Sequence, residues 1–381
     1  MHTPHLSTAL RLAESALWRT SPNPRVGCVL VNSDAMVIGQ GSTQAAGQAH
    51  AEVMALRDAQ QQGHSTAGAT AYVTLEPCAH QGRTGPCCDA LASAGIAHVV
   101  AALPDPNPLV AGQGFARLRA AGVSVTVASA QSDPALQTWA AASRELNLGF
   151  FSRMVRKTPW VRLKAAASLD GITALPNGQS QWITGAAARA DGHAWRARAC
   201  ALLTGIGTVL QDHPRLDVRE VDTPRQPKLV IVDSDLQTPP DAALFAAPRQ
   251  VLIYCANPQA EQQAALEARG ATLVCMPGAA GPDGAKPKVD LTAMLRDLAV
   301  REINELHVEA GHKLNGSLLR AGLVDELLVY QAPLWLGTGA GMSNWGPLTE
   351  LSQGLRLQFR SVEMVGDDVR LLARVVGRDA F

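Results

Sequence analysis

The amino-acid sequence predicts an α/β protein of two domains. Short apolar runs that suit buried strands alternate along the chain with amphipathic stretches that suit helices. With 381 residues, the chain is longer than one hydrophobic core usually serves. A basic stretch, FFSRMVRKTP (150–159), separates two sets of these elements. We therefore expect one domain over residues 1–150 and a second over residues 158–381.

The first domain is expected to be a layered sheet. Apolar residues at helical spacing predict a helix over residues 6–17, and the segment SPNP (21–24) ends it. Strands follow over residues 26–31 and 36–39, and then a helix that starts near residue 50. The remaining elements are a strand at 71–75, a helix at 87–94, a strand at 98–102, a helix at 115–121, a strand at 123–127 and helical residues up to about 147.

The second domain repeats this alternation. A strand is expected over residues 160–167 and a helix over HAWRARA (193–199). The run PGAAGPDGAKPK (277–288) is rich in Gly and Pro, which indicates a surface loop. Further strands are expected at residues 201–204, 229–232, 251–254, 272–275, 305–308 and 327–330.

The composition favours a globular enzyme. The chain has 33 basic and 33 acidic residues, so no excess charge indicates binding to nucleic acid or to a membrane surface. No apolar stretch reaches the ~20 residues of a membrane span, and the first residues lack the apolar core of a secretory signal. Seven scattered cysteines argue against a disulfide framework. We therefore expect a cytoplasmic protein with free thiols.

One constellation predicts a catalytic zinc site. His50, Cys78 and Cys87 supply the nitrogen and sulfur ligands that zinc prefers, and a catalytic zinc ion keeps its fourth position for water. Both cysteines are expected at helix starts, where the helix dipole stabilises a thiolate. The order H-x-E, P-C, C is typical of zinc-dependent base deaminases. In these enzymes the metal makes a hydroxide and a glutamate that is not a ligand, here Glu52, carries protons.

The same residues are also compatible with a structural zinc site. A closed structural zinc site would need a fourth protein ligand, for which Cys88 or His80 are candidates. In addition, residues two apart on a regular helix point in different directions, so His50 and Glu52 reach one site only if His50 occupies an irregular first turn.

Four segments in order make the deaminase pattern more specific: PNPRVGCV (22–29), HAE (50–52), TLEPCAHQGRTGPC (74–87) and DPNP (105–108). Together they resemble the deaminase half of the bifunctional bacterial riboflavin-biosynthesis enzymes. In these enzymes a diaminohydroxyphosphoribosylaminopyrimidine deaminase is fused to a 5-amino-6-(5-phosphoribosylamino)uracil reductase. The resemblance implies a cytidine-deaminase-like α/β/α layered domain with one zinc ion.

The same resemblance assigns substrate contacts in this half. Asn23 and His80 would hold the pyrimidine, and Arg83 would contact the ribose phosphate, for which the guanidinium is suited. Thr43 stands where the family usually has His, and Gly85 stands where it usually has Pro. These two departures affect the expected substrate contacts, and they leave the zinc ligands and Glu52 in place.

In the second half, EAGHKLNGS (309–317) runs from a strand through a glycine-containing loop into a helix, where backbone N–H groups can receive a phosphate. Further segments of this half are VRLKAAASLDG (161–171), SQWIT (180–184), HAWRARA (193–199), GIGTVLQDHPRLDVR (205–219), IVDS (231–234) and VEAGHKLNGSLL (308–319). This ordered set resembles the reductase half of the same enzymes. The resemblance implies a dihydrofolate-reductase-like fold that uses NADPH.

Carried over by position, the resemblance implies two sets of contacts in this half. The residues expected to meet NADPH are Ala167, Trp182, Thr208, Asp212, Ser234, Gly311, Gly316 and Ser317. The residues expected to meet the substrate are Ser180, Arg196, Leu216, Arg219 and Glu309. Apart from the resemblance, Lys164 at the end of the expected strand is a candidate substrate contact or proton relay.

The predicted function is therefore a two-step conversion of a small-molecule pyrimidine ribotide. Zinc-dependent removal of an amino group would precede NADPH-dependent reduction of the ribosyl group to ribityl. The resemblance also implies a homodimer, or a higher homo-oligomer, formed through the reductase half. Two alternatives remain: a deaminase of another nucleotide, and a non-catalytic nucleotide sensor in which zinc is structural.

Overall fold

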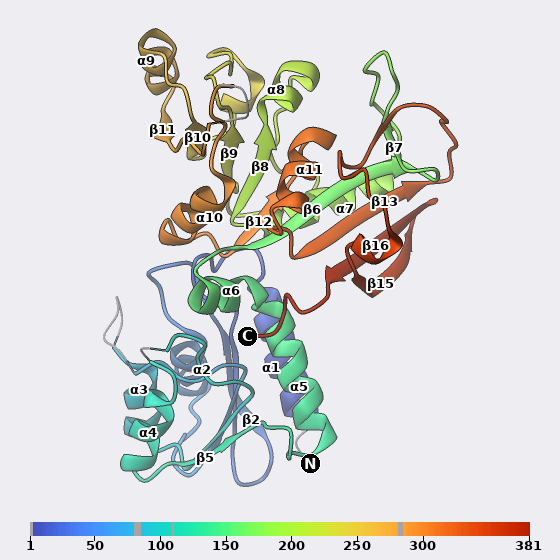
Figure 1. Ribbon diagram of the computed structural model, residues 1–381. Helices are drawn as coiled ribbons and strands as arrows, with labels where there is room; N and C mark the ends of the chain where they lie inside the picture. Colours follow the sequence, from blue (N-terminus) through green and yellow to red (C-terminus); the bar gives the residue numbers. More distant parts are fainter. Residues whose placement is uncertain (1–2, 80–84, 109, 281–284) are drawn as a thin grey trace. The chain divides into compact units, whose positions relative to one another are not determined.

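The computed structural model describes residues 3–79, 85–108, 110–280 and 285–381. The chain divides into two compact units (Figure 1). Unit 1 comprises Met1–Lys157 together with Phe381, and unit 2 comprises Thr158–Ala380. Among the described residues, no helix is both long enough and apolar enough to cross a membrane.

Unit 1 is built on a five-stranded sheet with the strand order β2-β1-β3-β4-β5. β1 is antiparallel to both β2 and β3, whereas β3, β4 and β5 are parallel to one another. The strands are β1 (Gly27–Val31), β2 (Val37–Ser42), β3 (Thr70–Val73), β4 (His98–Ala101) and β5 (Ser124–Val127).

Helices cover both faces of this sheet, which gives an α/β/α layered unit (Figure 1). The alternation of side chains along β1 divides the core, since Cys28 and Leu30 lie in one cluster and Val29 and Val31 in the other. α1 (Thr3–Ser15) and α5 (Pro134–Leu146) pack on the second cluster. The first cluster contacts α2 (Ala51–Gln61), α3 (Cys87–Ser93), α4 (Gln113–Ala120) and α6 (Leu148–Arg156).

α2 lies unusually close to β2. A Cβ atom added to Gly39 would stand 2.4 Å from the carbonyl oxygen of Ala55, and one added to Gly41 would stand 2.5 Å from that of Ala51. Glycine on the strand and alanine on the helix therefore let the two backbones approach. This packing fixes the start of α2 against the sheet. His50 directly precedes the helix, and Glu52 lies in its first turn.

Glu76 ties the loop after β3 to the start of α4. Its buried carboxylate accepts backbone N–H hydrogen bonds at 2.9–3.3 Å from Gly112, Gly114 and Phe115 and another at 3.0 Å from Asp105. These donors include N–H groups at the helix start that have no partner inside the helix. One side chain therefore holds the segment that follows β4 beside Cys78.

Unit 2 is built on a nine-stranded sheet with the order β11-β10-β9-β8-β12-β6-β13-β16-β15. The first seven strands in this order are parallel, and β16 and β15 add an antiparallel edge. The strands are β6 (Trp160–Ser168), β8 (Ala201–Gly205), β9 (Lys228–Val232), β10 (Val251–Cys255), β11 (Ala271–Cys275), β12 (Glu305–Val308), β13 (Glu326–Ala332), β15 (Leu357–Val365) and β16 (Asp368–Val375).

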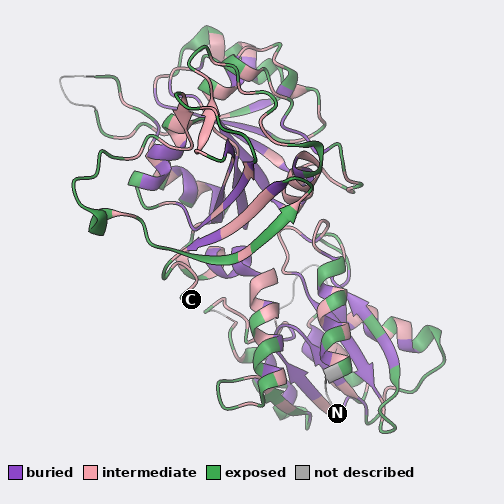
Figure 2. Cartoon of the chain, turned by 90° about the vertical axis from the view of Figure 1, so that its right-hand side faces the viewer, coloured by how far each residue is buried: buried purple, intermediate pink, exposed green. Residues whose placement is uncertain are grey.

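Helices also cover both faces of the second sheet, and its central strands are buried (Figure 2). α10 (Leu291–Val300) and α11 (His312–Arg320) pack on the face that carries Leu163 and Val308. The other face contacts α7 (Ala186–Arg198), α8 (Ile206–Asp212) and α9 (Ala260–Ala268). Smaller elements are β7 (Ile172–Ala174), which pairs with β14 (Ala340–Gly341), and the 3-10 turns Ala243–Phe245 and Leu351–Gln353.

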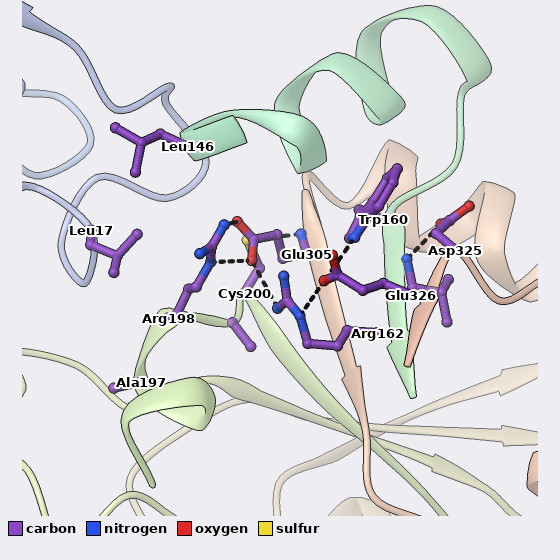
Figure 3. Close-up of polar contacts among 12 residues, drawn as sticks. Leu17, Leu146, Trp160, Arg162, Ala197, Arg198, Cys200, Glu305, Asp325 and Glu326 are labelled. Carbon is purple, nitrogen blue, oxygen red and sulfur yellow. Dashed lines mark hydrogen bonds and ion pairs between the residues drawn. The ribbon is translucent and has the colours of Figure 1, made fainter. Parts of the chain in front are cut away.

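Charged side chains are buried on the face of the sheet under α7. Arg162 lies 2.7 Å from Glu326 and 3.2 Å from Glu305, and Arg198 of α7 lies 2.8 Å from Glu305 (Figure 3). The guanidinium of Arg162 also lies 4.4 Å from the ring centre of Trp195. Each buried carboxylate therefore faces at least one guanidinium, the pairing that a charge needs once it leaves water.

The helical residues expected up to about 147 form α5, whereas the structure differs from the sequence expectation in several other elements. The basic stretch 150–159, expected to separate the domains, lies mostly in a further helix, α6, which Asn147 separates from α5 while its side chain bonds to the backbone of Arg25. The pair β7–β14 and the hairpin β15–β16 were not predicted. The glycine-rich run 277–288, expected to be a surface loop, joins β11 to α10, and an isolated bridge between Pro277 and Val289 closes its base. Residues 281–284 of this run lie outside the described residues.

Replacement of Glu76 by Gln should loosen unit 1. The amide keeps one acceptor oxygen and turns an NH₂ group toward backbone donors, so we expect a loss of about 2–4 kcal/mol of stability. Hydrogen exchange of the segment that starts α4 should become faster, and the unfolding midpoint should fall. Glu14→Gln, the same change on the exposed side of α1, is the control. Exchange as slow as in the wild type would show that Glu76 does not hold this segment.

Candidate functional site

Three metal donors converge in unit 1. Nδ1 of His50 lies 3.6 Å from Sγ of Cys78 and 3.5 Å from Sγ of Cys87, and all three donor atoms lie within 4.8 Å of one another. A tetrahedral zinc ion, with Zn–S of about 2.3 Å and Zn–N of about 2.0 Å, separates sulfur and nitrogen ligands by roughly 3.5 Å. The donor set therefore fits zinc in both chemistry and spacing.

The first turn of α2 brings His50 and Glu52 to the same site. His50 is the residue before the helix and has an extended backbone (φ −78°, ψ 170°), while Glu52 lies inside the first turn. This is the irregular start that a shared site requires. Cys87 is the first residue of α3, and its N–H lies 3.4 Å from the sulfur of Cys78.

The protonation states suit metal binding and proton transfer. Hydrogen bonds from Cys87 and His50 lower the pKa of Cys78 to about 4, which favours the thiolate. The bond to Cys78, together with burial, raises the pKa of Cys87 while no metal is present. Burial, assisted by the Cys78 thiolate, raises the pKa of Glu52 to about 7. A carboxyl group with a pKa near neutrality can both accept and donate a proton.

The described donors leave the fourth metal position open. Cys88 does not belong to the cluster: it is buried in the hydrophobic core, and its sulfur lies 3.7 Å from Asp89. His80, the other candidate for a fourth ligand, lies outside the described residues. Three protein ligands with one open position are typical of catalytic rather than structural zinc.

The other predicted deaminase contacts are only partly within the described residues. Asn23 is half-buried in the segment before β1, where its N–H donates to the carbonyl oxygen of Thr20. Arg83, like His80, lies outside the described residues. Thr43 is buried beside Val26, with its N–H bonded to that residue's carbonyl oxygen. Gly85 has open space where a side chain would stand.

Unit 2 contains a pocket of about 820 Å³. It lies where β6, β8 and β12 end, and the helices that follow β8 and β12 start there. All six predicted substrate contacts line it: Lys164, Ser180, Arg196, Leu216, Arg219 and Glu309. Four predicted cofactor contacts also line it: Trp182, Thr208, Asp212 and Gly311.

A half-buried ion pair forms part of the pocket wall. Glu309 accepts two hydrogen bonds from Arg196, at 2.5 and 2.8 Å, and lies 4.0 Å from Nζ of Lys164. Burial alone would raise the pKa of Glu309, but the charges of Arg196 and Lys164 hold it well below its usual range. Burial lowers the pKa of Lys164, and Glu309 partly offsets this. The group therefore contains a firmly ionised carboxylate and a lysine that gives up its proton more readily than an exposed one.

Cationic groups gather at another part of the pocket wall. The side chain of Arg219 is 42% exposed and pairs with Asp217. The backbone N–H of Arg219 donates to Nδ1 of His193 at 3.2 Å. Burial and the nearby Arg196 and Arg219 lower the pKa of His193 to about 4, so this histidine is uncharged at neutral pH. A guanidinium with free surface next to a pocket is suited to a phosphate group.

The predicted cofactor residues fall into two groups. Thr208 and Gly311 lie together, since a Cβ added to Gly311 would stand 3.7 Å from Oγ1 of Thr208. Beyond the four that line the pocket, the remaining four predicted cofactor residues are not among its lining residues. Ala167 is buried in β6, Ser234 receives the N–H of Val289 at 3.3 Å, and Ser317 donates to the carbonyl oxygen of Lys313 within α11. Gly316 packs against Asn344, whose carbonyl oxygen would be 2.2 Å from an added Cβ.

Sequence reasoning did not identify several residues of these sites. Glu76 stands in the segment used for the resemblance, yet only the fold reveals that its carboxylate holds the loop beside Cys78. Arg189 lies 4.6 Å over the ring of Trp182, and His193 lines the pocket. The available signal was their spacing on α7, where His193 lies one turn and Arg189 two turns before Arg196. Residues three or four apart share a helix face.

Comparison with known proteins identifies the family. A profile of the cytidine and deoxycytidylate deaminase zinc-binding region matches residues 2–103, and one of the RibD C-terminal domain matches residues 159–371. The riboflavin biosynthesis protein RibD of Escherichia coli is 42% identical, with 96% of this chain and 97% of that protein covered.

Solved structures agree over nearly the full chain. RibD of Acinetobacter baumannii superposes with a TM-score of 0.86 at 39% identity, with 98% of each chain covered. The diaminohydroxyphosphoribosylaminopyrimidine deaminase/5-amino-6-(5-phosphoribosylamino)uracil reductase of Thermotoga maritima gives a TM-score of 0.82 at 29% identity, again with 98% of each covered. His50, Cys78 and Cys87 thus form the zinc-binding site of a deaminase domain. The chain belongs to the RibD family of riboflavin biosynthesis proteins and joins a pyrimidine deaminase to a reductase.

Proposed function

We propose that unit 1 deaminates 2,5-diamino-6-(5-phosphoribosylamino)pyrimidin-4(3H)-one. The observation that carries this proposal is a buried carboxyl group, Glu52, beside three zinc donors whose fourth position is filled by none of the described residues. Zinc held by His50, Cys78 and Cys87 would supply an activated water at neutral pH. Glu52 then takes a proton from the attacking water and gives one to the departing ammonia. By resemblance, Asn23, His80 and Arg83 hold the substrate.

Unit 2 then reduces the ribosyl group of the deaminated product to ribityl. NADPH would supply the hydride that forms the new C1′–H bond, while the bond between C1′ and the ring oxygen breaks. The ring oxygen needs a proton, and Lys164 is suited to donate it because burial lowers its pKa. Arg196 and Arg219 are assigned to the substrate phosphate, and Ser180, Leu216 and Glu309 to its remaining contacts.

The assignment of cofactor contacts follows the same pocket. Trp182, Thr208, Asp212 and Gly311 line it and are the first candidates to meet NADPH. The N-termini of α8 and α11 open toward it, and unpaired backbone N–H groups there suit a phosphate. Ala167, Ser234, Gly316 and Ser317 are retained as contacts by resemblance alone.

Three further points complete the proposal. The sequence-based domain limits are residues 1–150 for the deaminase and 158–381 for the reductase, and the compact units extend the first as far as Lys157 and add Phe381 to it. None of the seven cysteines forms a disulfide, which accords with the reducing cytoplasm. The reductase domain forms a homodimer through β15, which is an edge strand with exposed apolar side chains at Phe359, Val362 and Met364.

Replacement of Glu52 by Gln should stop deamination and leave the zinc site filled. The amide cannot carry a proton, so ammonia release from the ribotide should fall about 10²–10⁴-fold. Zinc content, measured by mass spectrometry, should stay at one ion per chain, and reduction of the deaminated ribotide should be unchanged. Asp89→Asn, an exposed carboxyl group on α3, is the control. Wild-type ammonia release by the Glu52 variant would favour the alternative in which zinc is structural.

Replacement of Arg219 by Ala should weaken binding of the deaminated ribotide in the reductase pocket. Loss of a charge-assisted contact to phosphate should raise KM about tenfold and change kcat much less. Steady-state NADPH oxidation with varied ribotide measures both constants. Arg296→Ala, on the exposed side of α10, should leave them unchanged. A normal KM in the Arg219 variant would move the phosphate elsewhere.

Replacement of Phe359 by Glu should disrupt the proposed dimer. Phe359 is 65% exposed on β15, and a charge there would be buried without a partner in a dimer. Light scattering should report a dimer for the wild type and a monomer for the variant. Val300→Glu, at an exposed apolar site on α10, should remain dimeric. A wild-type chain that is monomeric at micromolar concentration would refute the dimer.

A further inference from the structure

A buried histidine lies directly behind the reductase pocket. His307 is in β12, has no exposed surface, and neither of its ring nitrogens makes a well-formed hydrogen bond to the described residues. Alternation along the strand puts its side chain on the same face as Glu305 and Glu309. An apolar residue would fill this place without the cost of burying two polar atoms, so a histidine here calls for an explanation.

Its closest polar neighbour is Glu309. Nε2 of His307 lies 3.5 Å from Oε1 of Glu309, the oxygen that also accepts the 2.5 Å bond from Arg196. The other oxygen, Oε2, accepts from Arg196 at 2.8 Å and lies 4.0 Å from Lys164. Glu309 therefore has cations on the pocket side and an imidazole on the side of the sheet. Hydrogen bonds of catalytic groups are often long in the free protein and shorten in the complex.

The surroundings keep His307 uncharged. Burial lowers its pKa, Glu309 raises it again, and the cations Arg162 and Lys164 lower it further. A neutral imidazole has one N–H, and the Nε2 tautomer directs it at the Glu309 carboxylate. The charged and titratable groups around it are Glu305 on β12 and Glu309 just after it, Arg162 and Lys164 on β6, and His193, Arg196 and Arg198 on α7.

We propose that His307 is a positioning residue of the reductase site, whose Nε2–H holds Glu309 in place while Arg196 engages the substrate phosphate. This inference rests on the proposed reductase function. Arg196 supplies both short hydrogen bonds to Glu309, so its move toward a phosphate weakens that hold. The carboxylate would then take up a proton more readily and would no longer support the charge of Lys164. His307 keeps Glu309 ionised and aimed at Lys164 through this exchange.

The test is steady-state reduction of the deaminated ribotide by the full-length protein across pH. His307→Leu removes the donor, and His307→Gln retains an N–H donor near the position of Nε2. For the Leu variant we expect kcat to fall about tenfold with KM within about twofold, since a hydrogen bond to a charged group is lost. Without that donor the pKa of Glu309 rises, so the acid limb of the kcat profile should move to higher pH. The Gln variant should restore most of kcat and the wild-type acid limb.

Thr204→Val is the matched control, because the hydroxyl of Thr204 is also buried with no hydrogen-bond partner in the described part of the chain. Thr204 follows Leu203, the residue of β8 that pairs with Val308. It should keep the wild-type kcat and pH profile. Thermal unfolding of each variant separates a role in packing from one in positioning: the Leu variant should unfold no earlier than the wild type.

The outcomes are distinct. A Leu variant with the wild-type kcat and acid limb overturns the proposal and leaves the reductase assignment standing. Equal losses in the Leu and Gln variants, with earlier unfolding in both, also overturn it, since that result indicates packing. If the Leu variant does not fold, the Gln variant alone tests the proposal. Because it retains the N–H donor, an acid limb at higher pH than in the wild type would contradict the proposal. A wild-type protein that does not reduce the ribotide removes the proposed function and this inference with it.

Discussion

The cost of removing a carboxylate from water organises both units of this chain. Glu76 is buried and is satisfied by four backbone N–H groups, which fixes the loop beside the zinc ligands. Glu326 is buried and Glu309 is half-buried, and both are satisfied by arginines. Glu52 is also buried, but its neighbours are a thiolate and a histidine rather than a guanidinium, and its pKa rises to about 7. Glu326 and Glu309 face arginines and stay ionised. Glu52 faces no guanidinium of the described residues, so its carboxyl group can take up and release a proton.

The two sites use helix starts in the same way. In unit 1, the first turns of α2 and α3 deliver His50, Glu52 and Cys87 to one point. In unit 2, the starts of α8 and α11 meet beside the ends of β8 and β12, where Thr208 approaches Gly311. Side chains at such positions need no further folding of loops to reach each other. Each unit has a core of its own, so the two chemistries are built independently in one chain.

The sequence predicted the zinc site better than the reductase site, for physical reasons. Few residue types bind zinc, so His50, Cys78 and Cys87 were recognisable from type and spacing alone. The reductase pocket is assembled from common residues on several elements, and its prediction depended on resemblance. The hairpin β15–β16 was missed because the edge strand β15 is exposed on both faces and lacks the alternation of a half-buried strand. The role of Glu76 and the position of His307 behind Glu309 are long-range or buried contacts, for which sequence spacing carries no signal.

The central claim is that one chain deaminates the ribotide in unit 1 before it reduces the product in unit 2. The most direct measurement is a single time course with zinc-loaded protein, the diaminopyrimidinone ribotide and NADPH, in which ammonia and NADPH are followed together. We expect ammonia to appear without delay, NADPH consumption to lag behind it, and the lag to vanish when the deaminated ribotide is supplied instead. NADPH consumption that precedes ammonia, or that proceeds at the wild-type rate from the diamino compound when Glu52 is replaced by Gln, would contradict the account.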